Sequence, residues 1–346
     1  MQRRAPIDGQ KLSDQVKDRL ADKPIIKKSG KLVSTGSTLL DLAISGGTYD
    51  EGGLPGGILV EIFGPSGCGK TVLLCEIAGG VQRAGGEALF RDPEARLDKQ
   101  FASLFGFDAD KASYGTPDTV VELFESIREW KPSREDEING IFADSLAALS
   151  TEMEMADKDK MGQKRAKDFS EQCRKTCRIL TQRNLLMVCS NQVRENIDAG
   201  PYSEKYKTPG GTAIGFYASV RLRCRQNEKL KREVTIGGKK QTRVYGVETA
   251  IHVMKNSIDK PYRDALLRID FEYGIDDVSA NLDFLKTSTG MTTYQLGETK
   301  LGASLERAAR SVEEGNLEAD LRQRVIELWH EIEEKFKVER KPKVRM

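Results

Sequence analysis

The chain has 346 residues, of which 38% are hydrophobic and 31% are charged. This composition is typical of an ordinary globular protein, and the length predicts one large domain together with a smaller one. The formal net charge of +2 is too small to indicate the kind of partner. Any electrostatic evidence for a partner therefore has to come from local charged patches.

Targeting signals and cysteine spacing narrow the class of protein further. No apolar run follows Met1, and no stretch of about 18 apolar residues occurs anywhere in the chain. We therefore expect a cytoplasmic protein without a membrane partner. The six cysteines form no CxxC pair and only two histidines are present, which argues against a metal cluster and a disulfide framework.

The first part of the chain alternates between apolar segments and helical patterns. A polar stretch with a helical pattern at 12–20 comes first, followed by a short apolar segment at 39–44 and a glycine-rich connection at 46–57. The regular part then predicts strands at 58–63, 87–91, 140–143 and 185–189, and helices at 70–83, 120–130 and 163–183. Because each strand is almost entirely apolar, we expect a mostly parallel central sheet with helices covering both faces.

The pattern changes in the second part of the chain. Successive strands are predicted at 217–225, 243–255 and 265–271, with a turn at Gly237-Gly238, and they indicate an antiparallel extension of the sheet. Beyond residue 274 the chain becomes acidic and helical, notably at 305–336. We place a small C-terminal α/β domain at 275–346.

One glycine-rich loop matches a phosphate-binding motif in full. The residues that fit the pattern GxxxxGK[ST] are Gly64, Pro65, Ser66, Gly67, Cys68, Gly69, Lys70 and Thr71. The loop follows a predicted strand and precedes a predicted helix, so backbone N–H groups and the helix N-terminus can surround a phosphate. Lys70 is expected to reach the β- and γ-phosphates, and Thr71 to ligate Mg²⁺. The sequence therefore predicts a site for ATP with Mg²⁺.

Two carboxylates are expected at the same edge of the sheet as this loop. Asp144 ends the strand at 140–143 and is the expected Mg²⁺ ligand, although an aspartate at this place is also suited to cap a helix. Glu94 follows the strand at 87–91 and is the candidate base that activates the attacking water. The alternative for Glu94 is a solvated carboxylate in a turn.

Further segments, in a fixed order and spacing, surround these residues. They are 34–43 (STGSTLLDLA), 53–57 (GLPGG), 92–98 (DPEARLD), 143–149 (ADSLAAL), 190–194 (SNQVR), 210–222 (GGTAIGFYASVRL) and 253–256 (VMKN). Together they resemble the bacterial RecA family of DNA recombinases over residues 34–275, and the run at 210–222 is much more specific than a phosphate loop alone. The resemblance implies a RecA-like P-loop ATPase core at 34–274, preceded by an oligomerisation segment at 1–33.

The resemblance also assigns roles around the nucleotide. It implies that Glu94 activates water, that Gln192 senses the γ-phosphate, and that Lys255 reaches the γ-phosphate from the neighbouring subunit. Contacts to adenine are implied for Asp98, Phe101 and, across the interface, Phe271. Active sites in such a filament lie between subunits.

Two polar loops are implied to bind DNA, at 152–162 and at 194–211. The residues implied to contact DNA are Met161, Gly162, Lys164, Lys167, Ser170, Arg174 and Lys175 at the first loop, and Arg194, Lys205, Lys207, Gly210 and Gly211 at the second. Lysines and arginines there would neutralise phosphates, although a single surface lysine is more often only solvated. Arg221 and Arg223 alternate along a predicted strand and would contact either DNA or a neighbouring subunit.

The chain departs from the family pattern at several places, which include Pro93 and Arg96 beside Glu94 and the region before Ser34. Ser257 replaces an expected lysine, for which Lys260 is a candidate substitute, and the insertion Thr48-Tyr-Asp-Glu51 lengthens the glycine-rich connection. Residues 337–346 carry five basic residues and one acidic residue where the family often has an acidic tail. This tail either strengthens the capture of duplex DNA or is a solvated segment.

The resemblance thus implies an ATP-dependent recombinase with DNA-dependent ATP hydrolysis. Its partners would be single-stranded DNA, homologous duplex DNA, identical subunits in a helical filament, and loading or single-strand-binding proteins. A hexameric RecA-fold DNA motor or helicase is the main alternative, although the run at 210–222 argues against it. A nucleotide-binding regulator without catalysis and a small-molecule kinase are weaker alternatives.

Overall fold

The computed structural model describes residues 30–150, 161–195, 206–207 and 213–338. The chain divides into residues 1–31 and residues 32–346, and the elements below belong to the second unit. The helical pattern predicted at 12–20 lies outside the described residues. None of the helices in the described ranges is long and apolar enough to cross a membrane.

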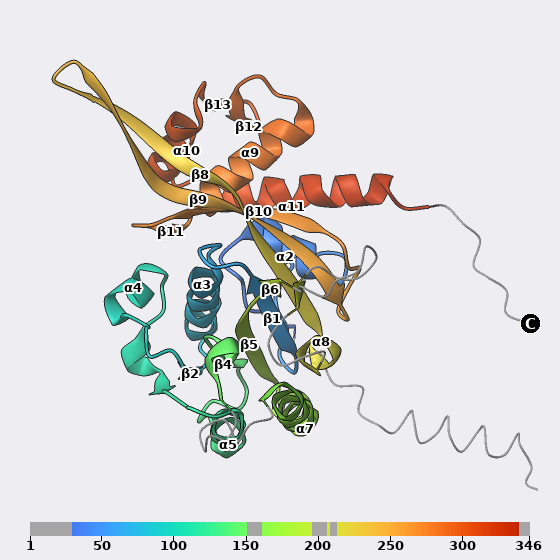
Figure 1. Cartoon of the computed structure of the whole chain (residues 1–346). Coiled ribbons are helices and arrows are strands. Elements are labelled where there is room, and N and C mark those ends of the chain that lie inside the picture. The colour runs from blue at the N-terminus through green and yellow to red at the C-terminus, as the bar shows by residue number, and fades with distance from the viewer. Residues whose placement is uncertain (1–29, 151–160, 196–205, 208–212, 339–346) are drawn as a thin grey trace, which may run out of the picture. The chain divides into compact units, whose positions relative to one another are not determined.

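A nine-stranded sheet has the strand order β11-β10-β9-β8-β1-β5-β4-β2-β3 (Figure 1). Neighbouring strands are parallel from β8 to β3, whereas β9, β10 and β11 continue the sheet in antiparallel pairing. The strands are β1 Leu59–Gly64, β2 Ala88–Arg91, β3 Ser113–Gly115, β4 Asn139–Ala143, β5 Leu185–Gln192, β8 Val220–Ile236, β9 Lys239–Asn256, β10 Asp264–Asp270 and β11 Gly274–Ile275. The predicted α/β fold with a mostly parallel sheet and an antiparallel extension is confirmed.

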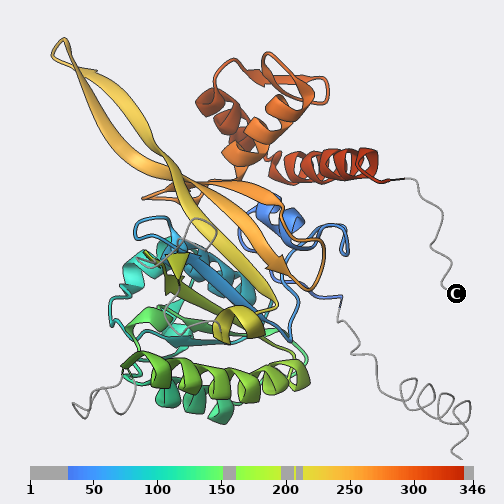
Figure 2. The same cartoon turned by 45° about the vertical axis from the view of Figure 1, so that its right-hand side comes forward.

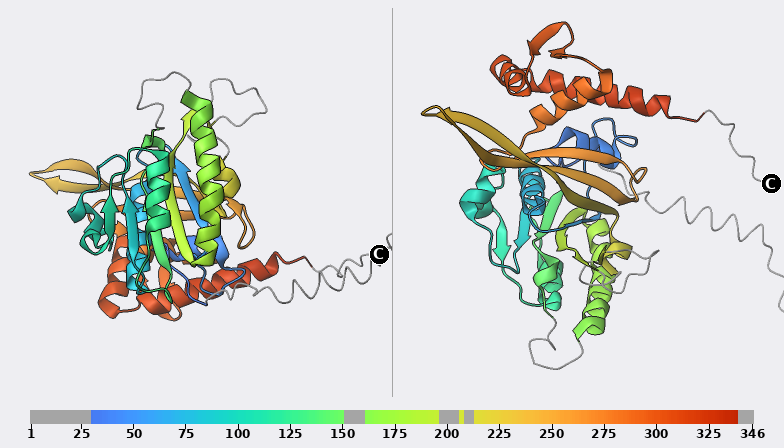
Figure 3. Two further views of the ribbon diagram at one scale, coloured as in Figure 1. Left: turned by 90° about the horizontal axis from the view of Figure 1, so that it is seen from below. Right: turned by 45° about the horizontal axis from the view of Figure 1, so that its top comes forward.

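The central strands are buried on both faces of the sheet. β1 and β4 are buried at every position, and β5 is buried at every position except its last residue, Gln192. Such strands need a helical layer on each face, because both faces carry apolar side chains. Helices α2 (Thr38–Ser45) and α3 (Lys70–Arg83) belong to the core on one face, and α5 (Val120–Glu129) and α7 (Met161–Gln182) to the core on the other (Figure 3).

Shorter elements connect the layers. They are α4 Lys99–Leu104, α8 Ala213–Tyr217, the 3-10 turns η1 Ala109–Lys111 and η2 Leu146–Ala148, and a separate ribbon of β6 Arg194–Glu195 with β7 Tyr206–Lys207. Along the chain, α8 lies between the second predicted DNA loop and β8. In space it contacts α7 and β1.

The C-terminal part contains three helices and a small two-stranded sheet. They are α9 Asp277–Thr289, β12 Tyr294–Leu296, β13 Thr299–Gly302, α10 Leu305–Gly315 and α11 Glu318–Lys335. The helical pattern predicted at 305–336 is therefore interrupted, because Asn316 takes a left-handed conformation with φ of 50° and ends α10. Asparagine tolerates this conformation better than most residues, and it is common at the end of a helix.

Strands β8 and β9 are longer than the sequence predicted. The turn at Gly237-Gly238 is confirmed, with φ of 56° and 75°, but the strands reach it without interruption. Figure 2 shows the resulting hairpin extending beyond the rest of the sheet. The exposed, polar sequence of this segment gives no apolar alternation, so the periodicity used for the other strands could not reveal it.

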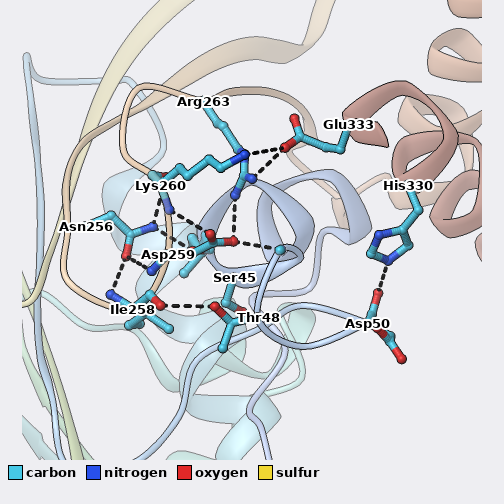
Figure 4. A network of polar contacts seen from close by, with 12 residues as sticks. Ser45, Thr48, Asp50, Asn256, Ile258, Asp259, Lys260, Arg263, His330 and Glu333 are labelled. Carbon is cyan, nitrogen blue, oxygen red and sulfur yellow. Dashed lines mark hydrogen bonds and ion pairs between the residues drawn. The ribbon is translucent and has the colours of Figure 1, made fainter. Parts of the chain in front are cut away.

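A polar network joins the inserted loop, the turn between β9 and β10, and α11 (Figure 4). The Arg263 guanidinium donates hydrogen bonds of 2.7 Å to both Asp259 and Glu333. His330 of α11 contacts the carbonyl oxygen of Asp50 at 2.8 Å. The insertion seen in the sequence therefore has a structural role, since it contacts α11 through Asp50 and Glu51.

Buried carboxylates gather where α2 and α3 meet β11 and α9. Burial raises the pKa of Asp41 to about 6 and the pKa of Glu76 to about 7. Burial also raises the pKa of Asp277, whose carboxylate accepts hydrogen bonds of 2.7 Å from the backbone N–H and the hydroxyl of Thr38. Each of these acids stabilises the fold better when it is protonated.

We expect Glu76→Gln to change how stability depends on pH. Because the folded pKa of Glu76 is raised from 4.5 to about 7, its contribution is fully present below pH 4.5 and is lost as the pH rises to 7. Glutamine keeps the oxygen that accepts from the Ile275 N–H at 3.3 Å. The variant should match the wild type in acid and exceed its free energy of unfolding by up to roughly 3 kcal/mol above neutrality.

Denaturant unfolding across this pH range measures the difference between the two proteins. The exposed Glu129→Gln serves as the control and should follow the wild type throughout. A Glu76→Gln curve parallel to that of the wild type would show that Glu76 does not titrate in this range.

Candidate nucleotide site

The phosphate loop joins the end of β1 to the start of α3. Gly67 and Gly69 have φ of 75° and 82°, a conformation that strains other residues. A Cβ on Gly69 would also lie 2.3 Å from the Ile269 side chain of β10. The loop can therefore turn its N–H groups inward only with glycine at these positions, and α3 begins directly behind it.

Lys70 lies folded back on its own loop. Its Nζ atom donates to the carbonyl oxygens of Gly64 at 3.1 Å and Pro65 at 2.7 Å, and the side chain is buried. These carbonyl oxygens accept the hydrogen bonds that the ammonium group would otherwise donate to phosphate oxygens. Lys70 thus lies against the phosphate loop, and its role as a phosphate ligand stays a prediction.

Asp144 connects the phosphate loop to the neighbouring strands. One carboxylate oxygen accepts a hydrogen bond of 2.7 Å from the hydroxyl of Thr71, and the other accepts from the hydroxyl of Ser190. Burial raises the pKa of Asp144, and the two hydroxyl donors oppose this shift. A buried carboxylate with two neutral donors fits a divalent cation, because the cation would favour its charged form.

Glu94 lies on the loop that follows β2. Its carboxylate accepts from the hydroxyl of Ser145 at 2.8 Å and pairs with Arg96 at 2.9 Å. The loop itself is shaped by the buried Asp92, which accepts from the backbone N–H groups of Arg96 and Leu97, both at 2.8 Å. Asp92 thus sets the position of Glu94 and was not singled out from the sequence, although its place at the end of a strand was a signal.

These groups line one cavity of about 780 Å³ at the carboxyl edge of the parallel strands. Gln192, Asp98, Phe101 and Phe271 line the same cavity as Lys70, Thr71, Glu94 and Asp144. Phe101 and Phe271 are partly exposed, at 37% and 49%, and the Phe101 ring meets the Phe105 ring edge-on at 4.4 Å. Phe271 lines this cavity within its own chain, whereas the resemblance implied a contact across the interface.

The volume, the glycine loop, the buried lysine and the paired Thr71 and Asp144 fit a nucleoside triphosphate with a divalent cation. Such a loop, between a strand and a helix with an acid at the end of a neighbouring strand, defines a P-loop nucleoside triphosphatase site.

Comparison with known proteins refines this class. The family model described as "RecA N-terminal domain" matches residues 16–276. Protein RecA of Thermus thermophilus is 33% identical over 324 residues, covering 91% of this chain and 89% of the relative. Protein RecA of Sulfurimonas denitrificans is 35% identical over 333 residues (92% and 86%), and that of Helicobacter pylori is 34% identical over 316 residues (87% and 84%). The chain belongs to the RecA family.

Lys255 lies on β9, outside the cavity of its own chain. Its Nζ atom donates to the carbonyl oxygens of Gly215 at 3.0 Å and Phe216 at 2.7 Å, at the end of α8. Burial and the nearby Arg221 lower its pKa. Lys260, the candidate substitute for the missing lysine, instead lies 3.9 Å from Glu333 of α11.

The structure describes part of the predicted DNA-binding set. Lys167, Ser170 and Arg174 are spaced along α7 so that they share one face of the helix, and Lys175 pairs with Glu171 at 2.7 Å. The backbones of Met161, Gly162 and Lys164 belong to the first turn of α7. Arg194 lies opposite Lys207 in the antiparallel register of the β6–β7 ribbon. Lys205, Gly210 and Gly211 lie outside the described residues.

A buried polar row beneath the phosphate loop was not predicted from the sequence. Glu61 of β1 is fully buried and accepts from Arg221 of β8 at 2.6 Å and from Asn191 of β5 at 3.1 Å. The Arg221 guanidinium also lies over the Phe63 ring at 4.6 Å. Arg221 is therefore held by contacts within its own chain, and its contact with DNA or a neighbouring subunit stays a prediction.

We expect Glu61→Gln to destabilise the fold by about 3 kcal/mol, because it leaves the half-buried Arg221 without a charged partner. Combining it with Arg221→Met should recover part of this loss, and the double-mutant cycle gives the coupling energy of the pair. Glu171→Gln, which breaks an exposed pair on α7, should leave the unfolding midpoint unchanged. Strictly additive losses for Glu61 and Arg221 would contradict the pairing.

Proposed function

We propose that the chain is an ATP-dependent homologous recombinase that forms helical filaments on single-stranded DNA and exchanges strands with homologous duplex DNA. The supporting observation is that the residues implied to act on ATP do not all lie at one site of the chain. Glu94, Asp144 and Gln192 line the nucleotide cavity of their own chain, whereas Lys255 lies outside it, on another part of the sheet. A site that needs Lys255 is completed by a second subunit, and head-to-tail contacts that do not close generate a helical filament.

Hydrolysis in this proposal is phosphoryl transfer to water. Glu94 holds and deprotonates the attacking water once one carboxylate oxygen leaves Ser145 or Arg96. Lys70 exchanges its loop carbonyls for phosphate oxygens, and the neighbouring subunit's Lys255 adds charge at the γ-phosphate. Mg²⁺, held by Thr71 and Asp144, would neutralise charge on the phosphates when it is bound.

Gln192 would connect the nucleotide site to the second predicted DNA loop. It is the last residue of β5, and the second predicted DNA loop at 194–211 follows it directly. Binding there would be independent of sequence, because a recombinase has to leave the base edges free to pair. The segment at 1–33 would link subunits, and loading or single-strand-binding proteins would act as partners on the DNA.

We expect Glu94→Gln to lower ATP turnover on single-stranded DNA by roughly 10²-fold or more, since a general base contributes about that factor. The amide can still accept from Ser145, so nucleotide affinity should remain close to that of the wild type. Lys70→Ala should instead lose nucleotide binding. Phosphate release with and without single-stranded DNA, together with binding of a fluorescent ATP analogue, separates the two effects.

The exposed Glu129→Gln is the matched control for the loss of one carboxylate. Turnover by Glu94→Gln at the wild-type rate would remove Glu94 from the mechanism. Wild-type hydrolysis that single-stranded DNA does not stimulate would contradict the proposed function itself.

A further inference from the structure

The nucleotide cavity is lined by more acidic than basic side chains. Among the described residues that line it, five are acidic and two are basic. The acidic residues are Asp92, Glu94, Asp98, Asp144 and Asp270. The basic residues are Lys70 and Arg96. A nucleoside triphosphate brings further negative charge into such a site, so each cation that can reach its phosphates matters for binding and for hydrolysis.

The two cations differ in their freedom to move. Lys70 is buried, and its Nζ atom is held by the carbonyl oxygens of Gly64 and Pro65 within the phosphate loop. The side chain of Arg96 is 81% exposed, and its guanidinium contacts the carboxylate of Glu94 at 2.9 Å. An exposed ion pair of this kind contributes little to stability, so the guanidinium can leave Glu94 at a small cost.

The backbone at Arg96 is fixed although its side chain is exposed. Ala95 has φ of 51°, a left-handed conformation that is uncommon for a residue other than glycine. Its N–H donates to the carbonyl oxygen of Asp92 at 3.0 Å, and the Asp92 carboxylate accepts from the N–H groups of Arg96 and Leu97, both at 2.8 Å. The hydroxyl of Tyr114 donates to the same carboxylate at 2.9 Å. These contacts hold the turn against its strain and keep Arg96 beside the cavity.

Glu94 uses its two carboxylate oxygens for different partners. Oε1 accepts a hydrogen bond of 2.8 Å from the hydroxyl of Ser145, and Oε2 lies 2.9 Å from the Arg96 guanidinium. Departure of Arg96 would therefore free Oε2 for a water molecule while Ser145 still holds the carboxylate in place. A phosphate is the stronger partner for the guanidinium, because its oxygens match the planar fork of N–H groups in bidentate geometry.

We propose that Arg96 is a catalytic residue of its own subunit, whose guanidinium moves from Glu94 to the γ-phosphate when ATP binds. The move places positive charge where negative charge develops during hydrolysis, and it frees Oε2 of Glu94 for the attacking water. In that step the water oxygen bonds to the γ-phosphorus, and the bond from this phosphorus to the bridging oxygen breaks and leaves its electron pair on ADP. The water proton passes to Oε2, and Arg96 keeps all of its own protons.

This role of Arg96 rests on the proposed function only for its reaction, the hydrolysis of ATP. It adds a cation from the chain that also supplies the phosphate loop, whereas Lys255 would act at the site of a neighbour. The contribution of Arg96 therefore needs neither DNA nor a second subunit. It is measurable on the free protein, at concentrations below those at which subunits associate.

The first test measures nucleotide binding by the full chain without DNA. Titration with a fluorescent ADP and with a fluorescent, non-hydrolysable analogue of ATP gives the preference for the triphosphate. Arg96→Ala should lose about tenfold or more in affinity for the ATP analogue, because hydrogen bonds between charged groups are lost, and should keep the wild-type affinity for ADP. The control is Arg310→Ala, which removes an exposed arginine of α10 and should bind both nucleotides as the wild type does.

The second test measures ATP turnover by the same variants. The kcat of Arg96→Ala should fall by about 10²-fold or more, since one donor to the transition state is removed, and Arg96→Lys should recover part of the loss. Guanidinium ion, added well below denaturing concentrations, should restore turnover to Arg96→Ala and leave Arg310→Ala unchanged. All variants should keep the wild-type unfolding midpoint, because the Arg96–Glu94 pair is exposed on the arginine side.

Turnover by Arg96→Ala at or above the wild-type rate would overturn the proposal, since Arg96 would then only restrain Glu94. Reduced turnover with an unchanged preference for the triphosphate would also overturn it, because Arg96 would then position Glu94 without touching the phosphate. If single-stranded DNA does not stimulate hydrolysis by the wild type but Arg96→Ala still loses affinity for the ATP analogue, the proposed function fails and the role of Arg96 stands.

Discussion

The buried Asp144 carboxylate is the constraint around which the site is arranged. It receives Thr71 from the start of α3 and Ser190 from β5, and it follows β4 itself, so three elements meet at one charged group. Burial works against that charge and raises the pKa of Asp144. The hydroxyls of Thr71 and Ser190 oppose this shift, and a divalent cation at the same place would favour the charged carboxylate further.

Beneath this group, the sheet contains a second buried charge that serves the fold. Glu61 joins β5, β1 and β8 through Asn191 and Arg221. Asn191 directly precedes Gln192, and Arg221 lies against Gly215 of α8, whose carbonyl oxygen receives Lys255. The strand ends that carry Gln192 and Lys255 are therefore joined by one row of polar contacts.

The sequence predicted those parts of the structure that depend on local patterns. The apolar strands β1, β4 and β5 and the loop at 64–71 follow from periodicity and from a motif whose glycines have a stereochemical reason. The interruption at Asn316 and the length of β8 and β9 could not be predicted, because a polar exposed strand and a polar helix end lack an apolar signal. The Glu61–Arg221 pair joins residues 160 positions apart, and no local pattern reveals such a contact.

The candidate site shows the same division. Lys70, Thr71, Glu94 and Asp144 were placed from motifs and strand ends, and the structure brings them to one cavity. Phe271 lines the same cavity because β10 passes the phosphate loop, where Ile269 lies next to Gly69, and that proximity is a property of the whole sheet.

The central claim is that ATP binding at this cavity controls a helical filament on single-stranded DNA. Negative-stain electron microscopy of the full chain with single-stranded DNA, with and without a slowly hydrolysed ATP analogue, tests it most directly. The account predicts extended helical filaments that require both the analogue and the DNA, and their absence in Lys70→Ala. Closed rings, or filaments that form equally well without nucleotide, would contradict it.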